Sequence, residues 1–372
     1  MKENRRGRLK RLILPGLIFQ SVVISGGYGT GAELTEHVFP YGVKGGLLAI
    51  GVSTFLIWTL VCAISFEFAR VFKTFDYRSF FQKLLGRGWV LYEGCYLVML
   101  LLVLAVISAT AGESAIVLFG ASRWWGVAVM GGCIAALVLK GTAAVERFLS
   151  YWSYVLYAVY TLFLVMCFRA FHGAIAAQFD PMVQIQSGWA LGGAKYAFYN
   201  LGIIPAVLFA TRGAKSRKEA VLSGSLAAAI GVAPAIFLLV AMAGFYPDIM
   251  DAAVPINTVF QALHMPWLEY LFQLVLFGTL VETGTGYIKA LSDRIESTKG
   301  GGAIARRRVM LTGGCILTGV LVSGFGLTSL IRQGYGTITW GFLLIYVLPI
   351  TTAGVYKIIR EKRAIRVYMP PK

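Results

Sequence analysis

The sequence predicts an all-α polytopic membrane protein, and three observations carry that prediction. Apolar residues make up 58% of the 372 residues and charged residues only 14%, whereas soluble domains average about 45–50% apolar and about 25% charged residues. Apolar runs of the length that crosses a bilayer core, about 20 residues, recur along the whole chain. Basic residues gather in alternate loops between these runs. The shortage of charge excludes a soluble enzyme.

Ten apolar runs are long enough to count as transmembrane helices, and the fourth is the shortest. The predicted spans are 12–40, 45–71, 90–118, 124–139, 148–168, 190–211, 220–245, 267–291, 309–330 and 335–358. The five cysteines lie inside such runs without C-x-x-C spacing, so they are interpreted as small core residues rather than as metal ligands or disulfides.

The basic residues indicate the orientation of these spans. With ten spans, 29 of the 34 lysines and arginines fall on one side of the membrane. The five on the other side are Lys44, Arg123, Arg169, Lys195 and Arg332. By the positive-inside rule both termini are cytoplasmic, in a bacterial-type plasma (inner) membrane. The net charge of +17 is then a topological signal, and no nucleic-acid partner is needed to explain it.

The basic N-terminus and two segments between spans also carry structural signals. No small-residue cleavage site ends the first apolar run, so it is expected to be a retained helix rather than a signal peptide. Residues 75–86 place apolar side chains at helical spacing between charges, which predicts a short amphipathic helix on the cytoplasmic face. Residues 246–266 are too polar to span, and either a lid over an outer vestibule or an ordinary loop fits them.

An even split of ten spans gives two sets of five that run in opposite directions across the membrane. The predicted halves are residues 12–171 and 190–358, joined by an extracytoplasmic connection at 172–189 and flanked by cytoplasmic tails at 1–11 and 359–372. Inverted repeats of this kind place the substrate site between discontinuous helices. The first span of each half is therefore where a break is expected.

Both of those spans contain helix breakers. The first holds four glycines within the seven residues from Ser25 to Gly31. In the sixth, Pro205 lacks an N–H and clashes with the carbonyl of Leu201. Broken helices leave backbone polar groups that need a polar cavity or a ligand. The alternative interpretation is that the glycines only permit close helix packing.

Ionisable residues inside the spans are consistent with a path for a solute, because such residues are expensive in a membrane and usually face the bundle interior. Glu33 follows the glycine-rich break, and Glu282 lies within the eighth span. Glu36, His37 and Glu113 lie near enough to the interface to be simply solvated.

The eighth span carries a polar stripe. Thr279, Glu282, Thr283 and Gly286 are spaced at i, i+3, i+4 and i+7 and share one face of a helix. Two hydroxyls and a carboxylate can coordinate Na⁺ together with backbone carbonyls, or Glu282 can carry a proton. A stripe satisfied only by neighbouring helices remains the third interpretation.

The motifs GGYGTGAE and FPYG in the first span, NLGIIP in the sixth and the amphipathic segment 75–86 resemble the amino acid, polyamine and organocation (APC) transporter superfamily with the LeuT fold. Among these proteins the chain is most similar to the YkvI-like membrane proteins. The resemblance extends over essentially the whole chain. It implies a 5+5 inverted repeat in which helices 1 and 6 are discontinuous. It also implies that their exposed backbone, with helices 3 and 8, holds the substrate.

The resemblance also implies particular site residues. The implied substrate contacts are Gly26, Gly27, Tyr28, Gly29, Thr30, Tyr199, Asn200, Leu201 and Gly202. Glu33 is added to this set because it follows the break in the first span. The implied ion-coupling groups are the carbonyls of Val22 and Ser25 and the side chains of Thr279 and Thr283, with Glu282 at a position where relatives often have a hydroxyl or small residue. That glutamate puts Na⁺ coupling in question and favours H⁺ coupling or a cationic substrate. The D-P-G-N and Met-Pro-His motifs of metal-ion relatives are absent from the sequence.

The resulting hypothesis is a secondary active transporter of a small organic solute, an amino acid or a related amine or organic cation. It works by alternating access, either coupled to Na⁺ or H⁺ or as an exchanger. The aromatic residues Tyr28, Tyr196, Phe198 and Tyr199 beside Glu33 favour an amine or quaternary ammonium ion. A transporter-like receptor or a channel are the alternatives. Neither H-E-x-x-H nor G-x-S-x-G occurs, so no enzymatic activity is expected. The expected partners are the solute and the lipid bilayer, and Na⁺ or H⁺ takes the place of any cofactor.

Overall fold

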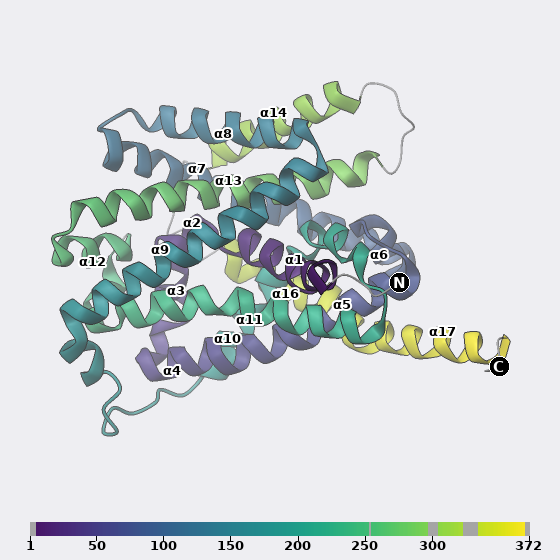
Figure 1. Ribbon diagram of the computed structural model, residues 1–372, viewed down its shortest axis with the longest axis horizontal. Coiled ribbons are helices and arrows are strands. Elements are labelled where there is room, and N and C mark those ends of the chain that lie inside the picture. Colours follow the sequence, from purple (N-terminus) through teal and green to yellow (C-terminus); the bar gives the residue numbers. More distant parts are fainter. Residues whose placement is uncertain (1–4, 253, 297–303, 323–333, 369–372) are drawn as a thin grey trace.

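A computed structural model describes residues 5–252, 254–296, 304–322 and 334–368, and the regular secondary structure in these ranges is helical (Figure 1). The main helices are α1 (Arg5–Val23), α2 (Gly26–Gly29), α3 (Ala32–His37), α4 (Gly42–Leu48), α5 (Phe55–Phe72), α6 (Tyr77–Leu85), α7 (Trp89–Phe119), α8 (Arg123–Lys140), α9 (Thr142–Ala177), α10 (Trp189–Leu201), α11 (Arg217–Met242), α12 (Pro255–Leu263), α13 (Pro266–Glu296), α14 (Ile304–Val322), α16 (Gly336–Phe342) and α17 (Val355–Tyr368). Short 3₁₀ and π segments join several of them: η1 (Phe39–Tyr41), η2 (Ala49–Thr54), η3 (Gly86–Gly88), η4 (Ile204–Ala206), η5 (Leu208–Gly213), η6 (Ala243–Phe245), η7 (Asp248–Asp251), η10 (Leu343–Val347) and η11 (Ile350–Gly354).

Seven helical stretches in the described residues are long and apolar enough to cross a membrane, and each coincides with a predicted span. They are Phe39–Phe72, Tyr77–Phe119, Arg123–Lys140, Thr142–Ala177, Arg217–Phe245, Pro266–Ile295 and Gly336–Glu361. Two of the other predicted spans, the first and the sixth, are interrupted by breaks. The remaining one, the ninth predicted span (residues 309–330), ends outside the described residues. Its described part contains the shorter apolar helix Met310–Leu321. The chain is a multi-pass membrane protein; the count of ten spans and the inverted repeat stay predictions.

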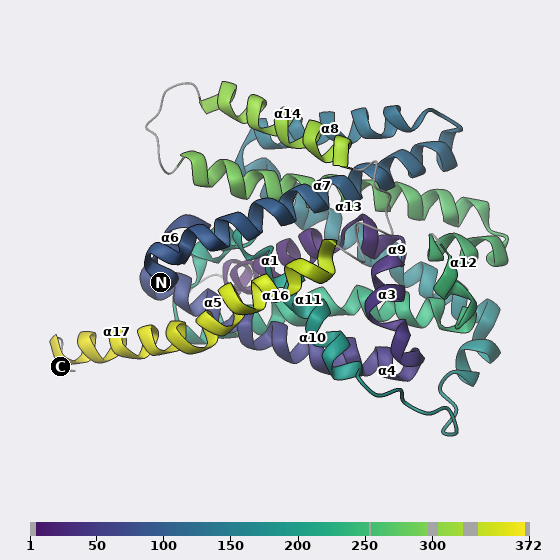
Figure 2. The ribbon, with the colours of Figure 1, turned by 180° about the vertical axis from the view of Figure 1, so that it is seen from behind.

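The helices form a bundle around α1. In both ribbon views α7, α8, α13 and α14 lie together on one side, whereas α4, α5, α10 and α11 lie on the other (Figures 1 and 2). Helix α1 runs between these groups and packs against α9, α11 and α13. The start of α1 and the end of α17 lie at the same end of the bundle as α6, and α12 lies at the opposite end.

The two segments between spans are both helical. Within residues 75–86 the structure contains the predicted helix, α6. Asp76 is its N-cap, because one Asp76 carboxylate oxygen accepts a hydrogen bond from the Ser79 N–H (2.9 Å). Phe80, Phe81 and Leu84 of this helix are buried. Within 246–266 the structure contains α12, whose apolar face is buried.

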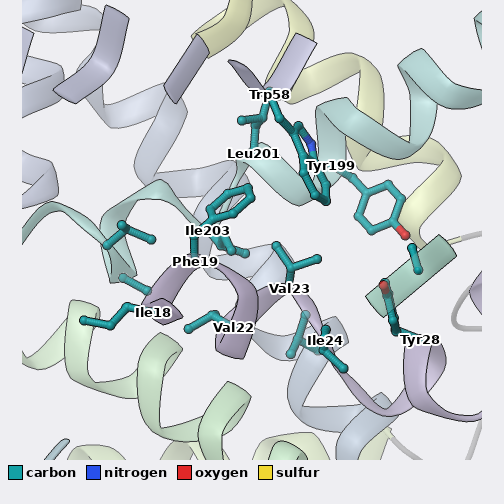
Figure 3. Close-up of a cluster of buried hydrophobic side chains, with 14 of the residues drawn as sticks. Ile18, Phe19, Val22, Val23, Ile24, Tyr28, Trp58, Tyr199, Leu201 and Ile203 are labelled. Atoms are coloured by element: carbon teal, nitrogen blue, oxygen red, sulfur yellow. The ribbon is translucent and has the colours of Figure 1, made fainter. Parts of the chain in front are cut away.

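Around α1 the core is apolar and tightly packed. Figure 3 shows side chains of α1, including Phe19 and Val23, against Trp58 of α5 and Leu201 of α10. The rings of Phe19 and Trp58 meet edge to face with centroids 5.0 Å apart, and the Trp58 indole N–H donates to the Ala197 carbonyl (3.2 Å). Helix α1 is therefore packed by apolar side chains against the side of the bundle that carries α5 and α10.

Helices α5 and α11 approach each other closely at Gly224, and this contact gives a stability prediction. A Cβ atom added at Gly224 would overlap the backbone of Cys62 and Ala63 in α5. Because backbone cannot rotate away as a side chain can, Gly224→Ala should lower the free energy of unfolding by about 1–3 kcal/mol. The measurement is thermal unfolding of the purified protein in detergent.

Gly132→Ala is the matched control, because a Cβ at the exposed Gly132 of α8 meets no atom within 4 Å. It should keep or slightly raise the unfolding temperature, since alanine favours helix more than glycine. Equal loss of stability in both variants would contradict the packing of α5 on α11.

Candidate functional site

The first span is broken twice, on either side of the four-residue helix α2. Helix α1 ends at Val23, and Ser25 is extended (φ −107°, ψ −175°) before α2 begins. Gly31 then adopts a left-handed conformation (φ 82°) before α3. Glycine takes this conformation without strain, which explains why the second break falls there.

The sixth span is broken four residues before its proline. Helix α10 ends at Leu201, and Pro205 lies in the 3₁₀ segment η4 that follows. This end point agrees with the clash predicted between the ring of Pro205 and the Leu201 carbonyl. The two breaks therefore have separate local causes, glycines in one span and a proline in the other.

Glu33 joins the two breaks. The Ser25 hydroxyl donates to Glu33 Oε1 (2.9 Å), and the Tyr199 hydroxyl donates to Glu33 Oε2 (2.5 Å). The carboxyl group of Glu33 thus links the residue before α2 to α10 across the bundle. Glu33 is only 1% exposed. A carboxylate removed from water needs hydrogen bonds or a cation to offset the lost hydration, so this group marks a functional position.

A small enclosed cavity lies beside this carboxyl group, and we call it the Glu33 cavity. Its volume is ≈ 10 Å³, close to the space that one water molecule occupies. The polar residues that line it are Ser25, Glu33, Tyr199, Asn200, Tyr287 and Tyr335. The buried Tyr287 hydroxyl has no hydrogen-bond partner among the described residues. An unsatisfied hydroxyl beside a buried carboxyl group indicates a place for a polar ligand.

The predicted substrate residues fall into two groups. Glu33, Tyr199 and Asn200 line the Glu33 cavity, and so do Val22 and Ser25, which the resemblance assigned to ion coupling. Gly26, Gly27, Tyr28, Gly29, Thr30, Leu201 and Gly202 are buried around it but do not line it.

The residues of the second group support the breaks in other ways. The Thr30 hydroxyl donates to the Gly26 carbonyl (2.8 Å), which satisfies one backbone group of α2. The Tyr92 hydroxyl of α7 donates to the Gly202 carbonyl (2.9 Å) just after α10. In Figure 3 the hydroxyl ends of Tyr28 and Tyr199 point toward each other at the edge of the apolar cluster.

A second polar cluster lies on the other side of α1, where it meets α9 and α13. The Ser21 hydroxyl donates to Glu282 Oε1 (2.9 Å) and lies 2.8 Å from the Ser153 hydroxyl. The Thr283 hydroxyl lies within hydrogen-bond distance of the carbonyls of Ile24 (2.9 Å) and Ser21 (3.4 Å). We call Ser21, Ser153, Glu282 and Thr283 the helix 8 cluster. The name refers to the predicted eighth span, which is α13, and not to α8.

The helix 8 cluster differs in detail from the predicted ion-coupling set. Thr283 faces carbonyls one residue before those of Val22 and Ser25. Thr279 lies outside the cluster, and its hydroxyl donates to the Leu276 carbonyl of its own helix (2.6 Å). Glu282 is fully buried, and its Oε2 has no hydrogen-bond partner.

Four polar residues of these sites were missed by sequence reasoning. Tyr287 lies four residues after Thr283, so extending the polar stripe of the eighth span would have found it. Ser21 likewise lies four residues before Ser25. Ser153 and Tyr335 lie in spans that contain other polar residues, such as Ser150 and Thr339, and nothing in the sequence singles them out.

Contacts at each end of the bundle close it around the first span. At the end that carries α12, the Ile256 N–H donates to the Thr30 carbonyl (3.1 Å), so α12 packs directly on the break in the first span. At the other end, Arg11 of α1 pairs with Glu219 of α11 (3.5 Å). With the residues that line it buried or nearly so, the Glu33 cavity is occluded.

Comparison with known proteins identifies the fold. No protein-family model and no curated protein sequence matches the chain. Among solved structures, a manganese transporter variant from Eremococcus coleocola is similar (TM-score 0.63, 15% identity, 92% of this chain and 78% of that one). So are MhsT in complex with L-phenylalanine (TM-score 0.62, 13% identity, 94% and 97%) and a Na⁺-coupled sialic acid symporter in a substrate-bound outward-open state (TM-score 0.54, 14% identity, 91% and 86%).

These neighbours are LeuT-fold transporters, and the chain has that fold. None of the three is an enzyme. Membership of the APC superfamily and the closer similarity to YkvI-like proteins stay predictions. Within the described residues no group of three or more His, Cys, Asp or Glu side chains is placed to hold a metal ion.

Proposed function

We propose that this protein is a secondary active transporter of a small organic solute, an amino acid or a related amine, that works by alternating access. The observation that carries the proposal is the pair of broken helices joined by the buried Glu33 carboxyl group. Breaks supply backbone groups for binding, and the halves on either side can tilt separately. The occluded Glu33 cavity supports a carrier over a channel, because a pore needs a continuous path.

The helix 8 cluster is the proposed site of ion coupling. It touches the last turn of α1 before the break, so an ion or proton bound there would change the position of α1. Glu282 can supply a charge for Na⁺ or take up H⁺. We also propose that both chain ends are cytoplasmic, since the positive-inside rule places the basic end of the bundle there.

Reconstitution tests the transport function. Purified protein in liposomes should take up a radiolabelled solute from a panel of amino acids and amines, at a rate at least about tenfold above protein-free vesicles under an imposed Na⁺ or pH gradient, because only coupled carriers accumulate solute against its own gradient. Binding without uptake under either gradient would indicate a receptor. Uptake that never saturates with solute concentration would indicate a channel.

A further inference from the structure

The residues that line the Glu33 cavity also indicate the chemical character of its ligand. It combines one carboxyl group with hydroxyl oxygens, and no lysine or arginine is among the described residues that line it. His37 contacts the ring of Tyr199 (centroids 5.4 Å apart) but does not line the cavity. The lining therefore has acidic character and an excess of oxygen acceptors.

We propose that the Glu33 cavity binds the primary ammonium head of a small monocationic amine, and that this amine is the solute of the transporter proposed above, on which the inference rests. A primary ammonium group has three N–H donors and no acceptor. The cavity offers three oxygen acceptors from different helices: the Glu33 carboxylate, the Tyr287 hydroxyl and the Tyr335 hydroxyl. Bound there, the ammonium group supplies the opposite charge that a buried carboxylate needs and a partner for Tyr287.

The volume of the cavity restricts the head group. At ≈ 10 Å³ it has space for one non-hydrogen atom with its hydrogens. A quaternary ammonium head has no N–H donor, so it cannot donate a hydrogen bond to the carboxylate or to the hydroxyls. The need for N–H donors favours a primary amine over a quaternary ammonium ion, although the aromatic residues near Glu33 could bind either cation.

The remaining lining indicates what is attached to the head. Val22, Val23, Met99, Val103 and Ile203 form the apolar part of the wall. These side chains can move apart for an apolar tail, but they give no donor to a carboxylate. A zwitterionic amino acid would place its carboxylate among them or beside Glu33, and either position is unfavourable. An amine without a carboxylate matches the site better than an amino acid does.

Thermal unfolding of the detergent-solubilised full chain tests this inference without any transport assay. Methylammonium chloride is the probe. Tetramethylammonium chloride at equal concentration controls for ionic strength and charge, because it has the same charge but no N–H donor. A ligand that binds only the folded state raises its apparent stability. We expect methylammonium to raise the unfolding temperature by at least about 2 °C over tetramethylammonium, and glycine and KCl to give no such shift.

Variants connect the shift to the cavity. Glu33→Gln keeps the shape, and its amide can accept from one of the two hydroxyls and donate to the other, but it lacks the charge and should abolish the shift. Tyr287→Phe removes only the unpartnered hydroxyl and should weaken the apparent affinity about tenfold, the cost of one hydrogen bond to a charged group. Tyr160→Phe is the matched control: its hydroxyl is also buried without a partner, but it does not line the cavity, and the shift should be unchanged.

A shift that survives in Glu33→Gln, or that tetramethylammonium, glycine or KCl produces equally in the wild type, would overturn the inference. The proposed function stands or falls separately. Transport of another solute without a methylammonium shift would disprove only the amine head, and a Glu33-dependent shift without any uptake would disprove only transport.

Discussion

Glu282→Gln in proteoliposomes is expected to abolish accumulation of the transported solute under an imposed Na⁺ or pH gradient, while exchange of labelled for unlabelled solute continues. Glutamine has nearly the shape of glutamate and can still accept the Ser21 hydrogen bond. It cannot carry a proton or a negative charge. Accumulation should therefore fall at least about tenfold, to the level of equilibration, because the driving ion no longer acts on the carrier.

The same vesicles provide both measurements, which separates loss of coupling from loss of folding. Glu269→Gln is the matched control, because it makes the same chemical change in the first turn of α13, far from the helix 8 cluster in the sequence of that helix. It should leave accumulation unchanged. Gradient-driven accumulation at the wild-type level in Glu282→Gln would show that coupling runs through other residues.

Gly26→Ala is expected to reduce transport by about 100-fold or more. An added Cβ would collide with the Thr110 hydroxyl of α7 and come within 3.2 Å of Leu280 of α13. The residue begins α2, so the methyl group would displace α2 from the position that sets Glu33 beside Ser25. Displacements of about 1 Å in a site can cost about 100-fold in rate. Initial rates of solute uptake measure the effect.

A second substitution tests the cause. Thr110→Ala removes the hydroxyl that the new methyl group meets, so the double variant Gly26→Ala/Thr110→Ala should recover part of the lost rate. Thr110→Ala alone should have little effect, because that hydroxyl bonds only the Val106 carbonyl of its own helix (3.0 Å). Gly94→Ala, at an exposed position of α7 with open space around it, is the glycine control. Failure of the double variant to recover any rate would contradict the packing of α2 on α7.

Several features of the fold were predictable because their causes are local. The apolar runs that make spans, the proline that ends α10 at Leu201, and the glycine at the left-handed position 31 all act within a few residues. The amphipathic spacing of α6 is local as well. For the same reason Glu33 and Glu282 stood out, since an acid within an apolar run is unusual wherever the rest of the chain lies.

Which polar groups meet was decided by tertiary structure alone. Glu33 and Tyr199 are 166 residues apart, and Ser21 and Glu282 are 261 apart. Helical periodicity tells which face a residue occupies but not which helix packs against that face. The sequence around Ser153 therefore does not show that this serine meets Ser21. The sequence by itself determined where the helices run and where they break. Only the packing of distant helices decided that the breaks share one carboxyl group and enclose a cavity, because buried polar groups take their partners from whichever helix is adjacent.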